Sequence, residues 1–181
     1  ATPPSRCRQP TCPTFTRSLS SIDNVTNGPQ HRLSHLDDHG AARMVDVSDK
    51  ARTARTATAS GVVHTTAEVI SLIGAGGLAK GDALATARVA GILAAKRTSE
   101  LIPLCHQLSL SGVDVSFAVT DSAIELTASV RTNDRTGVEM EALTAVTVAA
   151  LTVYDMIKAV DPAARLDDIR VVSKCGGKTG M

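Results

Sequence analysis

Asp155 and Lys158 are the two residues of this chain whose types and spacing best suit proton transfer. They stand three positions apart in a segment predicted to be helical, so their side chains share one face of that helix. The surrounding segment is apolar, and Tyr154 precedes the pair. A lysine desolvated beside a carboxylate can exchange protons near neutral pH. The alternative is an ordinary salt bridge at a solvated helix end.

Two further segments place reactive side chains among residues typical of a core, at 101–106 (LIPLCH) and 137–142 (GVEMEA). Buried polar groups are costly unless they are paired, so such clusters indicate a functional site. We interpret His106 as a ligand contact or proton carrier, with a hydrogen-bonded core histidine as the alternative. Glu139 and Glu141 either line a site or complement the positive end of a helix dipole.

Several lysines could bind an anion. Lys80 precedes a predicted helix N-terminus, where backbone N–H groups favour phosphate, and Lys96 is a second candidate. The turn at 176–178 (GGK) can bind an anion through its backbone and Lys178, unless it is only a flexible tail. It is not a P-loop, because Val172 occupies the position where that motif requires its first glycine.

The helix that carries Glu141 also carries Asp155, 14 residues later. At ~1.5 Å of rise per residue, the two carboxylates are roughly 21 Å apart along the helix axis. They cannot both contact one small reacting centre in a single chain. Either they contact different ends of a long ligand, or two subunits assemble the site.

Periodicity predicts the elements that position these residues. Alternating small, polar and β-branched residues predict strands at 53–64, 108–120, 123–130 and 169–172, with a hairpin at 121–122. Helices are predicted from a threonine cap at 65–66 through Ile73, from an Asp82 cap to about Ser99, and over 138–160, the last largely buried. This order predicts an α+β sandwich, with helices on one face of a mainly antiparallel sheet.

Length and composition limit the number of domains and the class of protein. A chain of 181 residues suits one domain, which we place at 33–181, and residues 1–32 have the composition of a disordered extension. Aromatic residues make up only 2%, so the core is built from small aliphatic side chains and oligomerisation is a reasonable inference. A net charge of +1 gives no indication of nucleic acid binding. No apolar run is judged long enough to span a membrane, and we expect a cytoplasmic protein.

Taken in order, nine motifs resemble one family, that of MoaC, the cyclic pyranopterin monophosphate synthase of molybdenum cofactor biosynthesis. The motifs lie at 44–48, 80–82, 85–88, 94–98, 101–106, 136–144, 154–156, 158–160 and 176–178. The resemblance implies a ferredoxin-like fold, a homohexamer built as a trimer of dimers, and active sites at subunit interfaces. It implies a lyase that converts a 3′,8-cyclised dihydro-GTP, made by a radical SAM GTP cyclase, to cyclic pyranopterin monophosphate and diphosphate.

The resemblance also implies roles for individual residues. Asp155 and Lys158 become the acid/base pair, assisted by Lys80. Substrate-binding roles fall on Leu104, Cys105, His106, Glu139, Met140, Glu141, Lys96 and Lys178. No resident metal is expected, although Mg²⁺ could accompany the triphosphate. A non-catalytic nucleotide-binding oligomer and a purely structural assembly protein remain as alternatives, and neither would need the Asp155–Lys158 pair.

The sequence departs from the family pattern at two places. Gln107 stands where the family often has proline. The residues at 133–135 (NDR) replace a more usual glycine-containing turn before Thr136.

Overall fold

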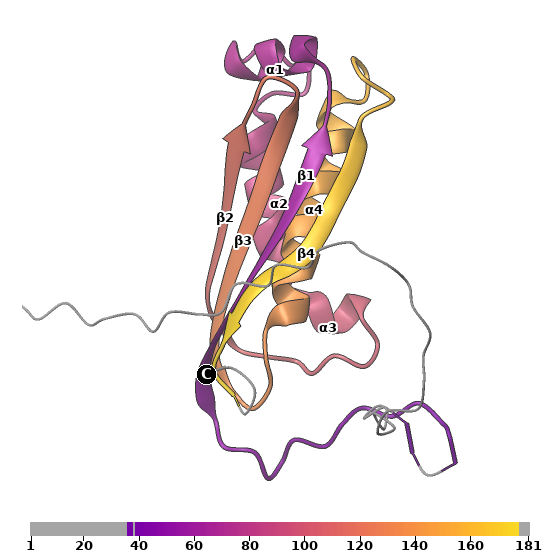
Figure 1. Ribbon diagram of the computed structural model, residues 1–181, viewed down its shortest axis with the longest axis vertical. Coiled ribbons are helices and arrows are strands. Elements are labelled where there is room, and N and C mark those ends of the chain that lie inside the picture. Colours follow the sequence, from indigo (N-terminus) through magenta and orange to yellow (C-terminus); the bar gives the residue numbers. More distant parts are fainter. Residues whose placement is uncertain (1–35, 38, 178–181) are drawn as a thin grey trace, which may run out of the picture.

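A computed structural model describes residues 36, 37 and 39–177 of the chain. Its centre is a four-stranded antiparallel sheet in the order β2-β3-β1-β4. Figure 1 shows the long helices α2 and α4 behind this sheet, with the sheet's other face uncovered by helices. The elements are β1 (Thr53–His64), α1 (Ala67–Gly74), α2 (Ala83–Lys96), α3 (Thr98–Leu101), β2 (Leu110–Val119), β3 (Ala123–Asp134), α4 (Glu139–Ile157) and β4 (Arg165–Cys175).

This arrangement confirms the predicted α+β class. A βαββαβ order with both helical connections on one face of an antiparallel sheet is the ferredoxin-like pattern. Each helical connection joins two parallel strands that have a third strand between them, so the sheet consists of two interleaved split βαβ units. The predicted extension at 1–32 and the predicted domain start at 33 lie outside the described residues.

The strands follow from the alternation of their side chains. In β1 every second residue from Ala57 to Val63 is buried against the helices, and the residues between them are partly exposed. β1 has the predicted bounds, and the predicted hairpin between β2 and β3 is confirmed. β3 and β4 are longer than predicted. β3 continues to Asp134 because its polar end still pairs with the start of β1, where Thr53 lies opposite Asp134.

The helix starts were predicted correctly. The Thr66 side chain accepts a hydrogen bond from Val69 N, and the Asp82 side chain accepts one from Ala85 N. The predicted extension of α2 to Ser99 is wrong, because α2 ends at Lys96 and a separate short helix, α3, follows. The Thr98 hydroxyl donates to Ala95 O at 3.0 Å, and such side-chain bonds to the preceding turn disfavour a straight helix.

Helices α2 and α4 run antiparallel and lie very close together. A Cβ built on Gly91 of α2 would be 2.9 Å from Ala145 O and 3.2 Å from the Ala149 Cβ, both on α4. Small residues along both helices allow this approach, which explains the alanine-rich composition of α2. The core between the helices and the sheet consists mainly of alanine, valine, leucine and isoleucine, as the scarcity of aromatic residues predicted.

Helix α4 corrects one further expectation. By length and composition it could cross a membrane, with a mean hydropathy of 1.4 over an 18-residue window. However, 56% of that window is buried inside the protein, against α2 and the sheet. Its apolar character is that of a core helix in a globular protein. The prediction that α4 is largely buried holds for its central turns, whereas Leu151 is 52% exposed.

Candidate functional site

One pocket gathers most of the predicted substrate-binding residues. It has a volume of about 210 Å³ and lies between the loop after α3 and the first turn of α4. We call it the glutamate pocket. Its lining residues are Leu104, Cys105, His106, Leu108, Thr136, Gly137, Glu139, Met140 and Glu141. Two segments predicted independently to carry chemistry therefore form a single site.

Hydrogen bonds to backbone carbonyl oxygens position the loop between α3 and β2, which lines this pocket. His106 Nε2 lies 2.7 Å from Val45 O, which ties the loop to the irregular segment before β1. The Thr132 hydroxyl, at the end of β3, donates to Ser109 O at 2.7 Å. Cys105 N donates to Ile102 O at 3.0 Å. His106 thus has the hydrogen-bond partner expected of a core histidine, and it lines the pocket as well.

Glu141 is the most deeply buried carboxylate of the pocket, with 4% of its surface exposed. Burial disfavours its charged form and, with the nearby charge of Glu139, raises its pKa to about 7. Burial and the charge of Glu141 also raise the pKa of the Cys105 thiol. Glu141 can therefore be neutral near pH 7 and donate a hydrogen bond, which an ordinary glutamate cannot do.

Glu139 has a different environment from Glu141. Its Oε1 accepts a hydrogen bond from Lys174 Nζ at 3.1 Å, and both side chains are about one-third exposed. Sequence reasoning missed Lys174, because it ended the last strand at Val172. The residues at 172–175 (VSKC) do not alternate and are all partly buried, so the sequence carried no clear signal that β4 extends to Cys175.

The predicted acid/base residues form a second cluster, which we call the aspartate–lysine cluster. Lys80 Nζ donates to Asp155 Oδ2 at 2.7 Å and to Asp155 O at 2.8 Å, while Lys158 Nζ lies 2.7 Å from Asp155 Oδ1. Hydrogen bonds from Lys158 and then from Lys80 lower the pKa of Asp155 to about 2, and Asp155 raises the pKa of Lys158. Three of the predicted catalytic residues, from two distant segments, therefore lie together in one chain.

The structure corrects one assumption about this cluster. The sequence suggested that its groups are desolvated, yet the side chains of Lys80, Asp155 and Lys158 are between 43% and 54% exposed. The pKa values of Asp155 and Lys158 are driven apart, not toward neutrality. In this single chain the cluster has the geometry of the solvated ion pair considered as the alternative.

The cluster and the glutamate pocket lie at opposite ends of α4, which carries Glu141 in its first turn and Asp155 in its last. The helix is continuous, so the separation expected from the sequence is confirmed. Lys96 ends α2 at the glutamate-pocket end of the helix pair, but it does not line the pocket. Lys178 lies outside the described residues.

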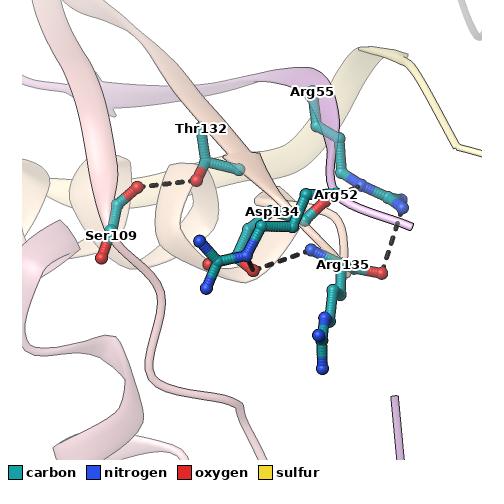
Figure 2. A network of polar contacts seen from close by, with 6 residues as sticks. All are labelled: Arg52, Arg55, Ser109, Thr132, Asp134 and Arg135. Atoms are coloured by element: carbon teal, nitrogen blue, oxygen red, sulfur yellow. Dashed lines mark hydrogen bonds and ion pairs between the residues drawn. The ribbon is translucent and has the colours of Figure 1, made fainter. Parts of the chain in front are cut away.

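A larger cationic pocket adjoins the glutamate pocket and shares Thr136 with it. We call it the arginine pocket; it has a volume of about 600 Å³. Its lining residues are Asp49, Lys50, Ala51, Thr53, Arg55, Arg135, Thr136 and Gly177. Sequence reasoning missed its cations and identified only the glycine turn at its edge. Figure 2 shows Arg55 and Arg135 at the turn that follows β3.

In the part of the chain that the structure describes, no group of three or more histidine, cysteine, aspartate or glutamate side chains is placed to hold a metal ion. The aspartate–lysine cluster and the arginine pocket instead combine lysine or arginine nitrogens with one carboxylate each. Such donors suit an anionic ligand.

Comparison with known proteins identifies the family. The family described as MoaC matches residues 44–177, which span both pockets and the aspartate–lysine cluster. The chain belongs to the MoaC family. Among its relatives, a Mycobacterium tuberculosis protein named cyclic pyranopterin monophosphate synthase 2 is 70% identical over 148 residues, covering 82% of this chain and 89% of the relative.

Other MoaC relatives carry the same functional name. The cyclic pyranopterin monophosphate synthase of Streptomyces coelicolor is 64% identical over 152 residues, covering 84% of this chain and 89% of its own length. The synthase of Chloroflexus aggregans is 56% identical over 156 residues, covering 85% and 94%. The resemblance expected from the sequence motifs is confirmed.

Proposed function

We propose that this protein is a cyclic pyranopterin monophosphate synthase, a lyase of molybdenum cofactor biosynthesis. It converts a 3′,8-cyclised dihydroguanosine triphosphate to cyclic pyranopterin monophosphate and releases diphosphate. The observation that carries the proposal is the convergence of six predicted substrate-binding residues on one pocket, in a chain whose MoaC relatives bear this name. The six are Leu104, Cys105, His106, Glu139, Met140 and Glu141.

The residues found suit the proposed chemistry. Opening the guanine imidazole ring and closing the pyrazine ring require proton transfers, for which Asp155 offers a proton acceptor and Lys158 a proton donor. Lys80, hydrogen-bonded to Asp155, orients that carboxylate. In the final step a substrate hydroxyl attacks the α-phosphorus, its proton goes to a base, and the bond to the diphosphate leaving group breaks. Cations stabilise the charge that develops on that group.

The triphosphate is the most highly charged part of this substrate. We assign Lys80, Lys96, Lys158 and Lys178 to it, as the family resemblance suggested. We propose that the enzyme needs no resident metal and that any Mg²⁺ enters with the triphosphate. A preparation treated with EDTA and then dialysed should keep full activity once Mg²⁺ is restored with the substrate. A need for a different, tightly held metal would contradict this.

We further propose a cytoplasmic homohexamer, a trimer of dimers, with active sites formed between subunits. Interface sites would bring the aspartate–lysine cluster of one chain to the glutamate pocket of another, which resolves their separation along α4. The substrate would come from the radical SAM GTP cyclase that precedes this enzyme. Nucleic acids and membranes have no part in this function.

The first experiment incubates the purified protein with enzymatically prepared cyclised dihydro-GTP. Diphosphate release is followed by a coupled assay, and the pyranopterin product by mass spectrometry. We expect both products in equal amounts. Tight binding of the substrate without turnover would refute the proposal in favour of a non-catalytic nucleotide-binding protein. Absence of binding would refute both and favour a structural role.

A mixing experiment tests the interface site separately. The variants Asp155→Asn and His106→Ala should each be inactive. If each site takes Asp155 from one chain and His106 from another, co-expression in equal amounts restores about a quarter of the sites by random assortment. Two copies of the same variant serve as the control. Failure to recover activity would contradict a site shared between chains, without contradicting the activity itself.

A further inference from the structure

The arginine pocket contains more positive than negative charge. Lys50, Arg55 and Arg135 line it, against the single carboxylate of Asp49. It shares Thr136 with the glutamate pocket, so the two volumes adjoin. A ligand whose ring system lies in the glutamate pocket could extend an anionic tail toward these cations.

The Arg55 guanidinium is already used by the protein backbone. Its Nε donates to Asp134 O at 2.9 Å, and its Nη2 donates to Arg135 O at 3.0 Å. A Cβ built on Gly177 would be 2.5 Å from Arg55 Nη1, so the C-terminal glycine turn also lies against this guanidinium. Arg55 therefore holds the turn after β3 in place, as Figure 2 shows.

Asp134 fixes the same turn from the other side. Its Oδ1 accepts a hydrogen bond from Arg135 N at 2.9 Å, and the Arg52 Nε lies 3.9 Å from that oxygen. The backbone of Arg135 is thus held at both its N–H and its carbonyl. This turn lies at 133–135, where the sequence departs from the usual glycine-containing turn.

The Arg135 side chain interacts with the charge of Asp46, but its Nε is not hydrogen-bonded within the described residues. Figure 2 shows its guanidinium extending away from Asp134 and Arg55. Its Nε is buried and has no hydrogen-bond partner among the described residues. A buried charged donor without an acceptor is costly, so an anionic ligand at this position would relieve that cost.

We propose that Arg135 binds the outer phosphates of the substrate's triphosphate, and that Arg55 is a positioning residue that holds the turn presenting Arg135. The planar guanidinium can pair with two phosphate oxygens at once, which a lysine cannot do. This inference rests on the proposed function, because it assigns the tail of that substrate. It also makes a prediction about polyphosphate binding that needs no turnover.

The direct test measures the affinity of the full chain for inorganic tripolyphosphate and for orthophosphate, by isothermal titration calorimetry at constant ionic strength. The unmodified protein should bind tripolyphosphate more tightly. Arg135→Gln should lose on the order of 10- to 100-fold in tripolyphosphate affinity, the usual effect of removing a charged hydrogen-bond donor. Wild-type affinity in this variant would overturn the inference.

Arg131→Gln is the matched control, because it removes the same charge four residues earlier, from β3. Arg131 forms an exposed ion pair with Asp114 at 2.8 Å, outside the pocket. Its tripolyphosphate affinity should stay within about twofold of the unmodified protein. An equal loss in both variants would mean that net charge alone attracts the anion, which overturns the role of Arg135. Circular dichroism and gel filtration verify that each variant is folded.

Two variants separate position from charge at Arg55. Arg55→Lys keeps the positive charge, but a single ammonium cannot reproduce the fork that joins Asp134 O and Arg135 O. We expect Arg55→Lys to lose nearly as much tripolyphosphate affinity as Arg55→Gln. Full affinity in Arg55→Lys would show that only charge matters and would overturn the positioning role.

Kinetics separate this inference from the proposed function. In an active enzyme, Arg135→Gln should raise KM more than it lowers kcat, because it weakens ground-state binding of the tail. Unchanged KM with normal turnover would overturn the inference alone. Polyphosphate binding that depends on Arg135 in a protein without turnover would overturn the proposed function alone.

Discussion

Replacing Glu141 with glutamine should stabilise the protein, relative to the unmodified chain, more at pH 8 than at pH 5. The folded chain holds the Glu141 carboxyl with a pKa of about 7, whereas the unfolded chain has the ordinary value of 4.5. Between these pH values the folded state binds more protons than the unfolded state, so stability falls as the pH rises through this interval. Glutamine resembles the neutral carboxylic acid and carries no such penalty.

The size of the effect follows from the shift. At about 1.36 kcal/mol per pKa unit, the full shift corresponds to ~3 kcal/mol. Part of this cost is already present at pH 5, because the unfolded carboxyl with a pKa of 4.5 is mostly ionised there, so the change between pH 5 and pH 8 is roughly 2 kcal/mol. The stability of Glu141→Gln relative to the unmodified protein should therefore rise by that amount from pH 5 to pH 8.

Urea unfolding at several pH values between 5 and 8 measures this difference directly. Subunit association would shift the midpoint, so the chain concentration is kept constant in all samples. Glu125→Gln, an exposed glutamate on β3, is the matched control and should show no pH-dependent difference. A difference between Glu141→Gln and the unmodified protein that stays constant from pH 5 to 8 would refute the reasoning.

Three other changes have expected outcomes. Asp155→Asn should abolish diphosphate release while gel filtration shows an unchanged assembly, and substantial remaining turnover would exclude Asp155 as an acid/base residue. Gly91→Ala should lower the free energy of unfolding by about 1–3 kcal/mol, because the new methyl group overpacks against Ala145 O. The higher helix propensity of alanine offsets this loss by about 1 kcal/mol. A higher urea midpoint would contradict the close packing of α2 on α4. Thr66→Ala should cost up to about 1 kcal/mol and speed amide exchange at the start of α1, with unchanged exchange at Val69 counting against the cap.

Most of the fold could be predicted because its signals are local. The alternation in 53–64 and the caps at Thr66 and Asp82 depend only on neighbouring residues, and the structure confirms all three. The ends of β3 and β4 were missed because their last residues are polar. Their extended conformation depends on pairing with β1, more than 70 positions away from the end of β3.

The same distinction separates the two pockets. The glutamate pocket could be predicted because its polar residues interrupt apolar segments, and that contrast is visible in sequence. The arginine pocket could not, because Arg55 and Arg135 lie in polar stretches where arginine is unremarkable. Their relation depends on a contact between Arg55 Nε and Asp134 O, across 79 positions of sequence. Such a contact follows only from the register of β1 and β3.

The solvated state of the aspartate–lysine cluster gives an independent reason to expect a shared site. With Asp155 at a pKa of about 2 and the pKa of Lys158 raised, neither group exchanges protons readily near pH 7. Removing water would raise the pKa of the carboxylate and lower that of the ammonium, which brings both toward neutrality. A single chain leaves this cluster about half exposed. We therefore expect the substrate, a second subunit or both to cover it during turnover. The mixing experiment tests the subunit contribution, because only a shared site lets two inactive chains restore each other.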